Sequence, residues 1–322
     1  MKILTRNETA AFLLAHDNYT ILSHRRPDGD TVGSSAALCL GLRQLGKKAH
    51  VLYNREVTPR FRWLHEGLTK PQAEEGDTLV STDVASPSML PKDFQHLQNA
   101  IALRIDHHAS ATSFTERELV DGGSASCAEL VWDVLERMGV RMDQPIAEAV
   151  YVGASTDTGC FRFSNTNAHT FAAASLCAQA GARIYELNQE LFETNTLGRL
   201  KIQGWIVENL RLLRGGQLAV CAIPKAVERE TMVTEDDMDN ISAFPRSVAG
   251  VKVAATLRET DDGEVKLSVR SVPEYDATKV TVRFGGGGHR SAAGASLHLE
   301  LEEAARLVER VMLESYPAEE KE

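Results

Sequence analysis

The sequence of 322 residues lacks the marks of several protein classes. Its five cysteines form no C-x-x-C pair, which argues against a structural zinc ribbon and against a disulfide framework. No apolar stretch approaches the ~18 residues of a membrane span, and the N-terminus is too polar for a signal peptide. We therefore expect a reduced, cytoplasmic protein that has no membrane partner.

Basic and aromatic residues are also scarce. Lys and Arg number 35 against 45 Asp and Glu, which leaves a net charge of −10 with neutral histidines, and aromatic residues make up 6% of the chain. Because no basic or aromatic-interleaved stretch offsets the acidic excess, we do not expect long duplex DNA or long single strands as partners. A short anionic ligand is compatible with this charge, since a metal ion or a local basic pocket can override it.

Two familiar motifs for phosphate binding and nucleophilic catalysis are missing as well. The sequence contains neither the P-loop pattern G-x-x-x-x-G-K-[ST] nor the G-x-S-x-G elbow. The segment from Asp28 begins like an EF-hand calcium loop, but Val32 and Cys39 stand where that loop needs oxygen ligands. Any chemistry must come from another arrangement of residues.

Short apolar runs alternate with helical patterns over the first two thirds of the chain. The strand-like runs cover 19–23, 50–53, 78–81 and 101–105, and the helical patterns include 34–45, 127–138 and 168–180. This alternation predicts a mostly parallel β-sheet flanked by helices, with ligands bound beyond the carboxyl ends of the strands.

The last third has a different texture, and the length of the chain favours two domains. After a helical stretch come β-like runs at 217–223, 250–257 and 264–271, and an amphipathic helix at 300–313 closes the chain. We therefore expect an N-terminal α/β domain at 1–190, a helical linker at 191–213 and a smaller α/β domain at 214–322.

Aspartate and histidine residues gather after the predicted strands and after one helical pattern. In chain order they are His24, Asp28, Asp30, Asp83, Asp106, His107, His108 and Asp157. A single Asp after a strand usually forms a turn or caps a helix, and Asp30 or Thr31 could cap the helix predicted from Ser34. Five aspartates and three histidines at one sheet edge, however, repel one another unless a cation neutralises them.

Divalent metal ions are the simplest source of that positive charge. Carboxylate and imidazole ligands suit Mn²⁺, and Mg²⁺, Co²⁺ or Zn²⁺ could substitute for it. Two ions held ~3.5–4 Å apart by a bridging carboxylate would stabilise both the attacking and the leaving oxygen in a phosphoryl hydrolysis.

A second signal is the run of four glycines at 285–288, which precedes His289. Glycine conformations can let backbone N–H groups approach an anion closely, and Arg283 and Arg290 flank the run with further donors. A flexible hairpin or linker would have the same composition. Arg270, on a neighbouring β-like run, could contact a ligand or could simply be a solubilising strand residue.

Together these motifs resemble those of the DHH phosphoesterases. The family has four motifs, and the similar segments here are His24-x-x-x-Asp28-x-Asp30, the isolated Asp83, Asp106-His107-His108 and Thr156-Asp157-Thr158-Gly159. The segment Gly286-Gly287-Gly288-His289 is similar to the substrate-binding motif of the C-terminal domain that accompanies them. The size and the motif order are most similar to the bifunctional oligoribonuclease/pAp phosphatases and their cyclic-dinucleotide phosphodiesterase relatives.

The resemblance implies a role for each of these residues. Two Mn²⁺ ions would be held, with Asp83 bridging them, by His24, Asp28, Asp30, Asp83, His107 and Asp157. Asp106 would orient a ligand histidine, and His108 would contact the scissile phosphate. The substrate's other end would be bound by Arg270, Arg283, Gly286, Gly287, Gly288 and His289. A homodimer formed through the N-terminal domain is also expected on this ground.

The function implied is hydrolysis by a water that two metal ions activate. The substrates would be 3'-phosphoadenosine 5'-phosphate (pAp) and short oligoribonucleotides, of about two to five nucleotides, which the acidic surface tolerates better than long strands. Alternatives that share the motifs are a phosphodiesterase acting on cyclic or linear dinucleotides and a RecJ-like single-strand exonuclease. A nucleotide-sensing module without turnover is the alternative outside enzymes.

Overall fold

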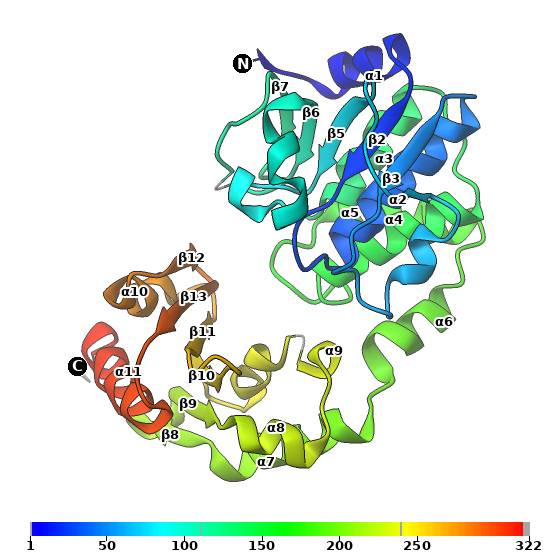
Figure 1. Cartoon of the computed structure of the whole chain (residues 1–322). Coiled ribbons are helices and arrows are strands. Elements are labelled where there is room, and N and C mark those ends of the chain that lie inside the picture. The colour runs from blue at the N-terminus through cyan, green and yellow to red at the C-terminus, as the bar shows by residue number, and fades with distance from the viewer. Residues whose placement is uncertain (1, 110, 239, 318–322) are drawn as a thin grey trace. The chain divides into compact units, whose positions relative to one another are not determined.

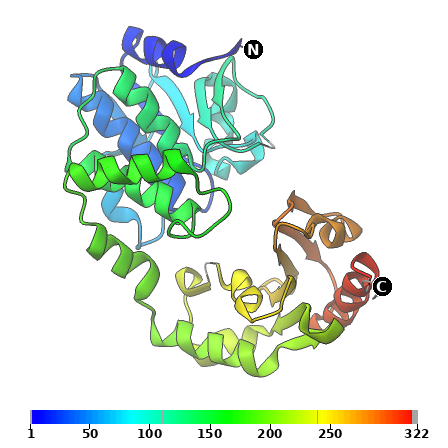
Figure 2. The same cartoon turned by 180° about the vertical axis from the view of Figure 1, so that it is seen from behind.

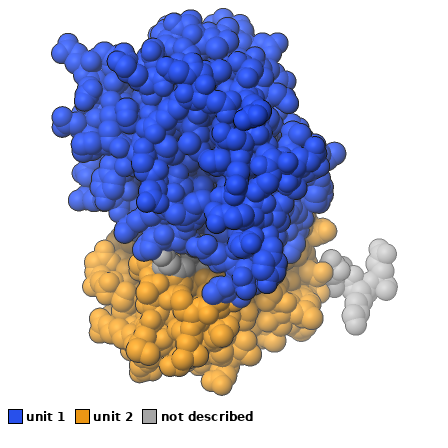
Figure 3. All heavy atoms as spheres, turned by 90° about the vertical axis from the view of Figure 1, so that its right-hand side faces the viewer, with its two compact units in different colours: residues 1–194 blue, residues 195–322 orange. Residues whose placement is uncertain are grey.

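The computed structural model describes residues 2–109, 111–238 and 240–317, and it divides into two compact units (Figures 1 and 3). Unit 1 is Met1–Thr194 and unit 2 is Asn195–Glu322. Each unit has its own β-sheet and its own hydrophobic cores. No helix among the described residues is both long enough and apolar enough to cross a membrane.

The sheet of unit 1 has seven strands in the order β1-β7-β6-β5-β2-β3-β4, and every neighbouring pair is parallel. Its strands are β1 (Lys2–Ile3), β2 (Tyr19–Leu22), β3 (Ala49–Leu52), β4 (Thr69–Lys70), β5 (Thr78–Thr82), β6 (Ile101–Asp106) and β7 (Arg117–Val120). The α-helices are α1 (Arg6–Ala15), α2 (Gly29–Gln44), α3 (Cys127–Arg137), α4 (Gln144–Asp157), α5 (Ala168–Gln179) and α6 (Ile184–Asn188). Short helical segments that are wound more tightly or more widely than an α-helix are η1 (Arg62–His65), η2 (Pro87–Met89), η3 (Lys92–Ala100) and η4 (Gln189–Glu193).

Both faces of this sheet are buried, as expected for parallel strands that are apolar along their whole length. Ile21 faces a core shared with α2, α3 and α4, whereas the next residue, Leu22, faces a second core closed by η2 and η3. The α-helices gather on one side of the sheet and the η2–η3 segment lies on the other (Figures 1 and 2). Helices α2 and α4 pack so closely that a Cβ at Gly33 would lie 2.4 Å from a backbone oxygen of α4.

Unit 2 contains a six-stranded sheet in the order β12-β13-β11-β10-β9-β8, in which only the β9–β10 pair is parallel. The strands are β8 (Arg211–Leu213), β9 (Leu218–Ile223), β10 (Val253–Glu259), β11 (Val265–Ser271), β12 (Gly287–His289) and β13 (Ala292–Leu297). The α-helices are α7 (Leu197–Asn209), α8 (Lys225–Thr231), α9 (Glu235–Met238), α10 (Thr278–Thr281) and α11 (Leu301–Ser315). Short turns form η5 (Arg214–Gly216), η6 (Ile241–Ser247) and η7 (Val282–Phe284).

The alternation of side chains along β11 separates the two faces of this second sheet. Val269 packs in the core that includes Val308 and Met312 of the amphipathic α11, whereas its neighbour Arg270 points to the opposite face. Part of that opposite face carries another core, in which α7 contacts Cys221 and Ile223 of β9. The segment 191–213, expected to be a helical linker, thus contains α7 and β8, both of which belong to unit 2 by packing.

Candidate metal centre

The predicted Asp and His cluster lies where the strand order of unit 1 reverses. From β2 the chain continues outward to β3 and β4, and from β5 it continues in the other direction to β6 and β7. Strands β6, β5 and β2 are therefore neighbours, and at their carboxyl ends they carry Asp106 with its two histidines, Asp83 and His24. A reversal point of this kind is where ligands bind in open α/β sheets.

Two aspartates come from the N-terminus of α2, Asp28 as its cap and Asp30 in its first turn, and the helix begins earlier than the sequence suggested. The helical pattern in the sequence begins at Ser34, and a cap at Asp30 or Thr31 was the alternative to a metal-binding role. Instead the helix starts at Gly29, because the Asp28 carboxylate accepts hydrogen bonds from the backbone N–H groups of Asp30 and Thr31 at 3.1 and 3.0 Å. Asp30 thereby becomes a helical residue that faces α3.

The buried Asp30 carboxylate is held by a second helix N-terminus. Its two oxygens accept hydrogen bonds from the backbone N–H groups of Cys127 (2.7 Å) and Ala128 (2.9 Å), the first residues of α3. These N–H groups have no partner within their own helix and carry part of its positive end charge, so they suit a carboxylate. Ser126 caps the same helix by accepting from the N–H of Glu129.

Asp83 stands at the middle of the cluster in an unusual backbone conformation. Its φ of 61° is in the left-handed region, which a residue other than glycine adopts only where the surroundings hold it. Its Oδ2 accepts a hydrogen bond from Thr31 Oγ1 at 2.8 Å. Its Oδ1 is buried and has no hydrogen-bond partner among the described residues. An unsatisfied buried carboxylate oxygen calls for a cation or a missing donor.

His24 and His107 are oriented in the same way. The Nδ1–H of each imidazole donates to a backbone carbonyl, that of Arg25 at 2.8 Å and that of Ser124 at 3.2 Å. In both residues this leaves Nε2 as the nitrogen that faces the carboxylates. The Nε2 of His24 lies 3.4 Å from Asp83, and the Nε2 of His107 lies 3.6 Å from it. A backbone carbonyl on the other ring nitrogen is the usual support of a metal-binding histidine.

Asp106 holds the side chain of His108. The resemblance implies that Asp106 orients a ligand histidine; of the two neighbouring histidines, His107 is held by the Ser124 carbonyl. Asp106 Oδ1 instead accepts hydrogen bonds from the backbone N–H of His108 at 3.2 Å and from its Nδ1 at 2.8 Å. Because these hydrogen bonds favour the charged carboxylate, the pKa of Asp106 is low despite its burial.

Asp157 reaches the cluster from the C-terminal end of α4, which continues past the helical pattern at 146–152 seen in the sequence. Its Oδ2 lies 3.5 Å from His107 Nε2. Burial, together with the nearby carboxylates of Asp28 and Asp83, raises the pKa of Asp157 to about 7. Burial would lower the pKa of His107, but the carboxylates around it prevail and raise that pKa to about 9. The cluster therefore favours positive charge.

Three groups of side chains in this cluster could hold a metal ion. In each group the ligand atoms lie within 4.8 Å of one another. The groups are His24, Asp28 and Asp83; Asp30, His107 and Asp157; and Asp83, His107 and His108. All eight Asp and His residues singled out in the sequence thus lie at this one edge of the sheet, and the first two groups share no residue.

The glycine run of unit 2 forms a β-hairpin rather than an open loop. Strand β12 pairs antiparallel with β13, and the pairing leaves no room for side chains on two of the glycines. A Cβ at Gly286 would lie 2.2 Å from the Gly294 carbonyl oxygen, and one at Gly288 would lie 2.6 Å from that of Ala292. Close strand contact therefore explains these two glycines without an anion.

Two of the predicted substrate-binding residues share one face of the second sheet, and a third does not. His289 pairs with Ala292, which in turn pairs with Arg270, so these side chains follow one row across three strands. Arg283 lies elsewhere, because its guanidinium forms an ion pair at 3.3 Å with Glu314 of α11, the helix on the opposite face.

Three residues support the centre although the sequence argument did not select them. Thr31 holds Asp83, the Ser124 carbonyl holds His107, and Arg104 lies 3.6 Å from Asp106 Oδ2. Only Arg104 gave a signal, as a charged residue within the otherwise apolar run at 101–105. The other two act through a hydroxyl and a backbone oxygen, which the sequence pattern does not distinguish from ordinary turn residues.

Comparisons with known proteins show which family the chain is similar to. Residues 18–154 match the model of the DHH family, N-terminal domain, and residues 215–314 match that of the DHHA1 domain. A bifunctional oligoribonuclease and PAP phosphatase, NrnA, of Thermus thermophilus is 33% identical over 90% of this chain and 88% of its own length. The Bacillus subtilis protein of the same name is 25% identical over 94% of this chain and 96% of its own. The crystal structure of an exopolyphosphatase-related protein from Bacteroides fragilis superposes with a TM-score of 0.83 at 22% identity, covering 96% of both chains.

Fold and site together define a two-domain α/β protein with a carboxylate–histidine cluster at the carboxyl edge of a parallel sheet. With both domain models matched in order, and a relative at 33% identity along nearly the whole chain, the protein belongs to the DHH family.

Proposed function

We propose that this protein is a metal-dependent phosphoesterase that hydrolyses short oligoribonucleotides and PAP. The whole-length similarity to oligoribonuclease and PAP phosphatase proteins supports the substrate class. The observation that carries the proposal is the cluster of unit 1, in which six carboxylate and imidazole residues form two separate groups of three. A long duplex is not an expected substrate, because the net charge of −10 disfavours it.

The two groups would each hold one divalent cation. His24, Asp28 and Asp83 would bind the first, and Asp30, His107 and Asp157 the second. Asp83 is the proposed bridging ligand, because its Oδ2 lies 3.4 Å from His24 and its Oδ1 lies 3.6 Å from His107. The mixed oxygen and nitrogen donors suit Mn²⁺, with Mg²⁺, Co²⁺ or Zn²⁺ as substitutes.

The residues fit such ions on grounds that do not depend on relatives. Asp83 Oδ1 is a buried oxygen without a hydrogen-bond partner among the described residues. Burial and the charge of Asp83 raise the pKa of Asp30 far above its ordinary range, so an ionised Asp30 is unfavourable unless positive charge is added. A cation at this place would supply it.

The protein's own groups would then position the reacting atoms. Bound cations would make a water nucleophilic near neutral pH and stabilise charge on the phosphoryl oxygens. Asp106 fixes the His108 ring by accepting from Nδ1, so that Nε2 is the nitrogen that would donate a proton to the leaving oxygen as its bond to phosphorus breaks. Arg270 and His289 of unit 2 would bind the other end of the substrate.

The decisive variant is Asp83→Asn, which keeps the size and the Thr31 hydrogen bond but removes the charge. We expect it to abolish hydrolysis of pApA and PAP, and to weaken Mn²⁺ binding measured by isothermal titration calorimetry. Asp17→Asn is the matched control, because Asp17 precedes β2 at the opposite end of the sheet and is exposed. Full activity of Asp83→Asn with unchanged Mn²⁺ affinity would contradict the two-metal assignment. Parallel assays with Mg²⁺ and with cyclic di-AMP would rank the metals and test the alternative substrate.

A further inference from the structure

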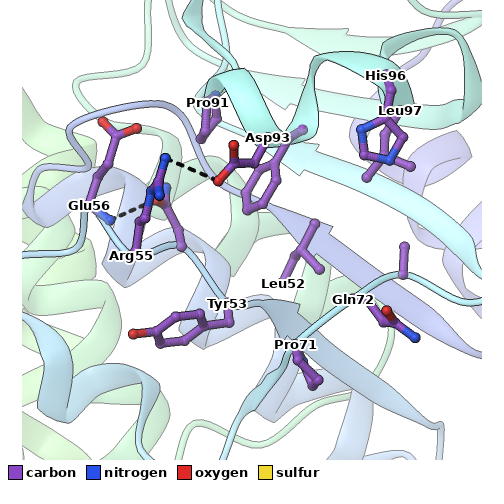
Figure 4. Close-up of a pocket in the computed structure, with 13 residues that line it drawn as sticks. Leu52, Tyr53, Arg55, Glu56, Pro71, Gln72, Pro91, Asp93, His96 and Leu97 are labelled. Carbon is purple, nitrogen blue, oxygen red and sulfur yellow. Dashed lines mark hydrogen bonds and ion pairs between the residues drawn. The ribbon is translucent and has the colours of Figure 1, made fainter.

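A pocket of about 500 Å³ opens in unit 1 (Figure 4). It lies at the carboxyl ends of β3 and β4 and against η3, so it shares the sheet edge on which the centre is built. Its volume is in the range of small-molecule sites in proteins. None of the metal-ligand candidates lines it, and the proposed mechanism does not use it.

One wall of the pocket is hydrogen-bonded to the backbone of a candidate ligand. Asn54 lines the pocket and is only 4% exposed, and its Nδ2 donates to the His24 carbonyl at 3.0 Å and to Ser23 Oγ at 3.1 Å. Glu56, also in the lining, accepts a hydrogen bond from the backbone N–H of Arg26 at 2.9 Å. The pocket wall and the loop that carries His24 therefore form one hydrogen-bonded piece.

The lining combines apolar walls with hydrogen-bond acceptors. Leu52, Phe94 and Leu97 supply apolar surface, and Tyr53, which is 57% exposed, adds an aromatic face. In Figure 4, Tyr53 and Pro71 lie on one side of the view, and Pro91, Asp93 and His96 lie on the other. A planar, largely apolar group with polar edges suits such walls.

The charges of the lining disfavour a phosphate in this pocket. Its one arginine, Arg55, is paired with Asp93 at 3.3 Å, and the lining also carries the Glu56 carboxylate. With neutral histidine the formal charge of the lining is thus −1, from one Arg against Asp93 and Glu56. Carboxylate acceptors suit a neutral group with N–H donors, such as the exocyclic amino group of a nucleobase.

We propose that this pocket binds a nucleobase, that of a nucleotide whose phosphate reacts at the neighbouring centre. The inference rests on the proposed function for the identity of the substrate, but the pocket's affinity for a base does not depend on turnover. Phosphate and base would thereby be separated. The phosphate would lie at the candidate metal centre, where bound cations would attract it, and the base would lie in an acidic, apolar pocket one strand further along the sheet.

The first test measures binding without catalysis. Adenosine, which has no phosphate, is mixed with metal-free wild-type protein, with Ala73→Trp and with Glu75→Trp, and saturation-transfer NMR detects contact with the adenine protons. Ala73 lines the pocket, so a tryptophan there fills it, whereas the exposed Glu75 lies outside the lining. We expect transfer in the wild type and in Glu75→Trp and its loss in Ala73→Trp. Equal transfer in all three proteins would overturn the proposal.

The second test uses pApA and two analogues in which one or the other adenine is replaced by hydrogen. With the wild-type protein, the KM of one analogue is expected to be about tenfold higher than that of pApA, because one stacked base is lost. Ala73→Trp should raise the KM of pApA to the same level. On the analogue that already lacks this base, the variant should cause no further rise in KM. Independent, multiplying effects of the variant and the missing base would overturn the pocket assignment.

The outcomes separate this inference from the proposed function. If wild-type protein binds adenosine but hydrolyses none of the substrates, the proposed function fails and the pocket stands as a base-binding site. If pApA is hydrolysed while Ala73→Trp leaves both adenosine binding and KM unchanged, the pocket inference fails alone. Tyr53→Ala provides a second variant that opens rather than fills the pocket, and it should also weaken adenosine binding.

Discussion

Replacing the buried Arg104 with Met is expected to destabilise unit 1 by about 3–5 kcal/mol, the usual cost of removing one partner of a buried ion pair. Arg104 is 1% exposed, and its Nη2 lies 2.9 Å from a carboxylate oxygen of the fully buried Glu118. Its Nη1 donates to the carbonyls of Ala85 at 3.1 Å and Thr112 at 3.0 Å. One side chain thus links the segments that follow Asp83 and His108.

The magnitude comes mainly from what is left behind. Without the guanidinium, Glu118 would remain charged in the interior, although it keeps hydrogen bonds from Ser113 Oγ and from the N–H groups of Phe114 and Thr115. The double variant Arg104→Met with Glu118→Gln removes that stranded charge and keeps an acceptor for the N–H groups. We therefore expect the double variant to be more stable than Arg104→Met alone, since the two losses are coupled.

Urea unfolding followed by circular dichroism would measure the free energy of unfolding of each variant. Arg141→Met, at an exposed arginine of the same unit, is the matched control and should change stability by no more than about 0.5 kcal/mol. The reasoning is refuted if Arg104→Met costs less than about 1 kcal/mol, or if the double variant is less stable than the single one.

Two further predictions concern single histidines. Burial lowers the pKa of His65 from 6.5 to about 4, so below pH 6.5 the unfolded chain takes up a proton that the folded protein excludes. The stability that this exclusion gives is fully present above pH 6.5 and falls as the pH drops toward 4, by about 2–3 kcal/mol at pH 4.5. Urea unfolding of His65→Gln should lack this loss, and parallel pH curves of the two proteins would disprove it. His289→Ala should mainly raise the KM for PAP, because His289 is proposed to bind the distal end of the substrate. His298→Ala, at an exposed histidine after β13, should not change it, and an unchanged KM in His289→Ala would remove the hairpin from substrate binding.

The long elements of the fold could be predicted because their patterns are strong and local. The strands after residues 18 and 77 are apolar runs that end at polar loops, and the amphipathic α11 has one apolar face. The edge strands β1 and β12 could not, since a segment of two or three residues becomes a strand only by pairing with a neighbouring strand. For the same reason the sequence left a hairpin and an anion-binding loop both open for the glycine run, and the pairing with β13 shows the hairpin.

The residues of the candidate site could be predicted from the sequence about as well as the fold. Residue type and position after strands were enough to select Asp83 and His107, because parallel strands bring their carboxyl ends to one edge. Asp106 contacts His108 because of the direction of a side chain two residues beyond the strand. The sequence pattern does not predict that direction. The support from Thr31 depends equally on the left-handed turn at Asp83, which only the folded backbone reveals.

These supports explain how a cluster of acids can exist before a cation arrives. Asp30 is held by two backbone N–H groups of α3 and Asp83 by a hydroxyl of α2, so the carboxylates are fixed by neutral donors rather than by charge. Neutral donors orient the oxygens but do not cancel their repulsion, and burial together with this repulsion raises the pKa of Asp157 to about 7. The folded protein therefore stores an electrostatic cost at this edge. A ligand that binds the folded state alone and relieves that cost stabilises the fold by the same interaction that would drive the chemistry.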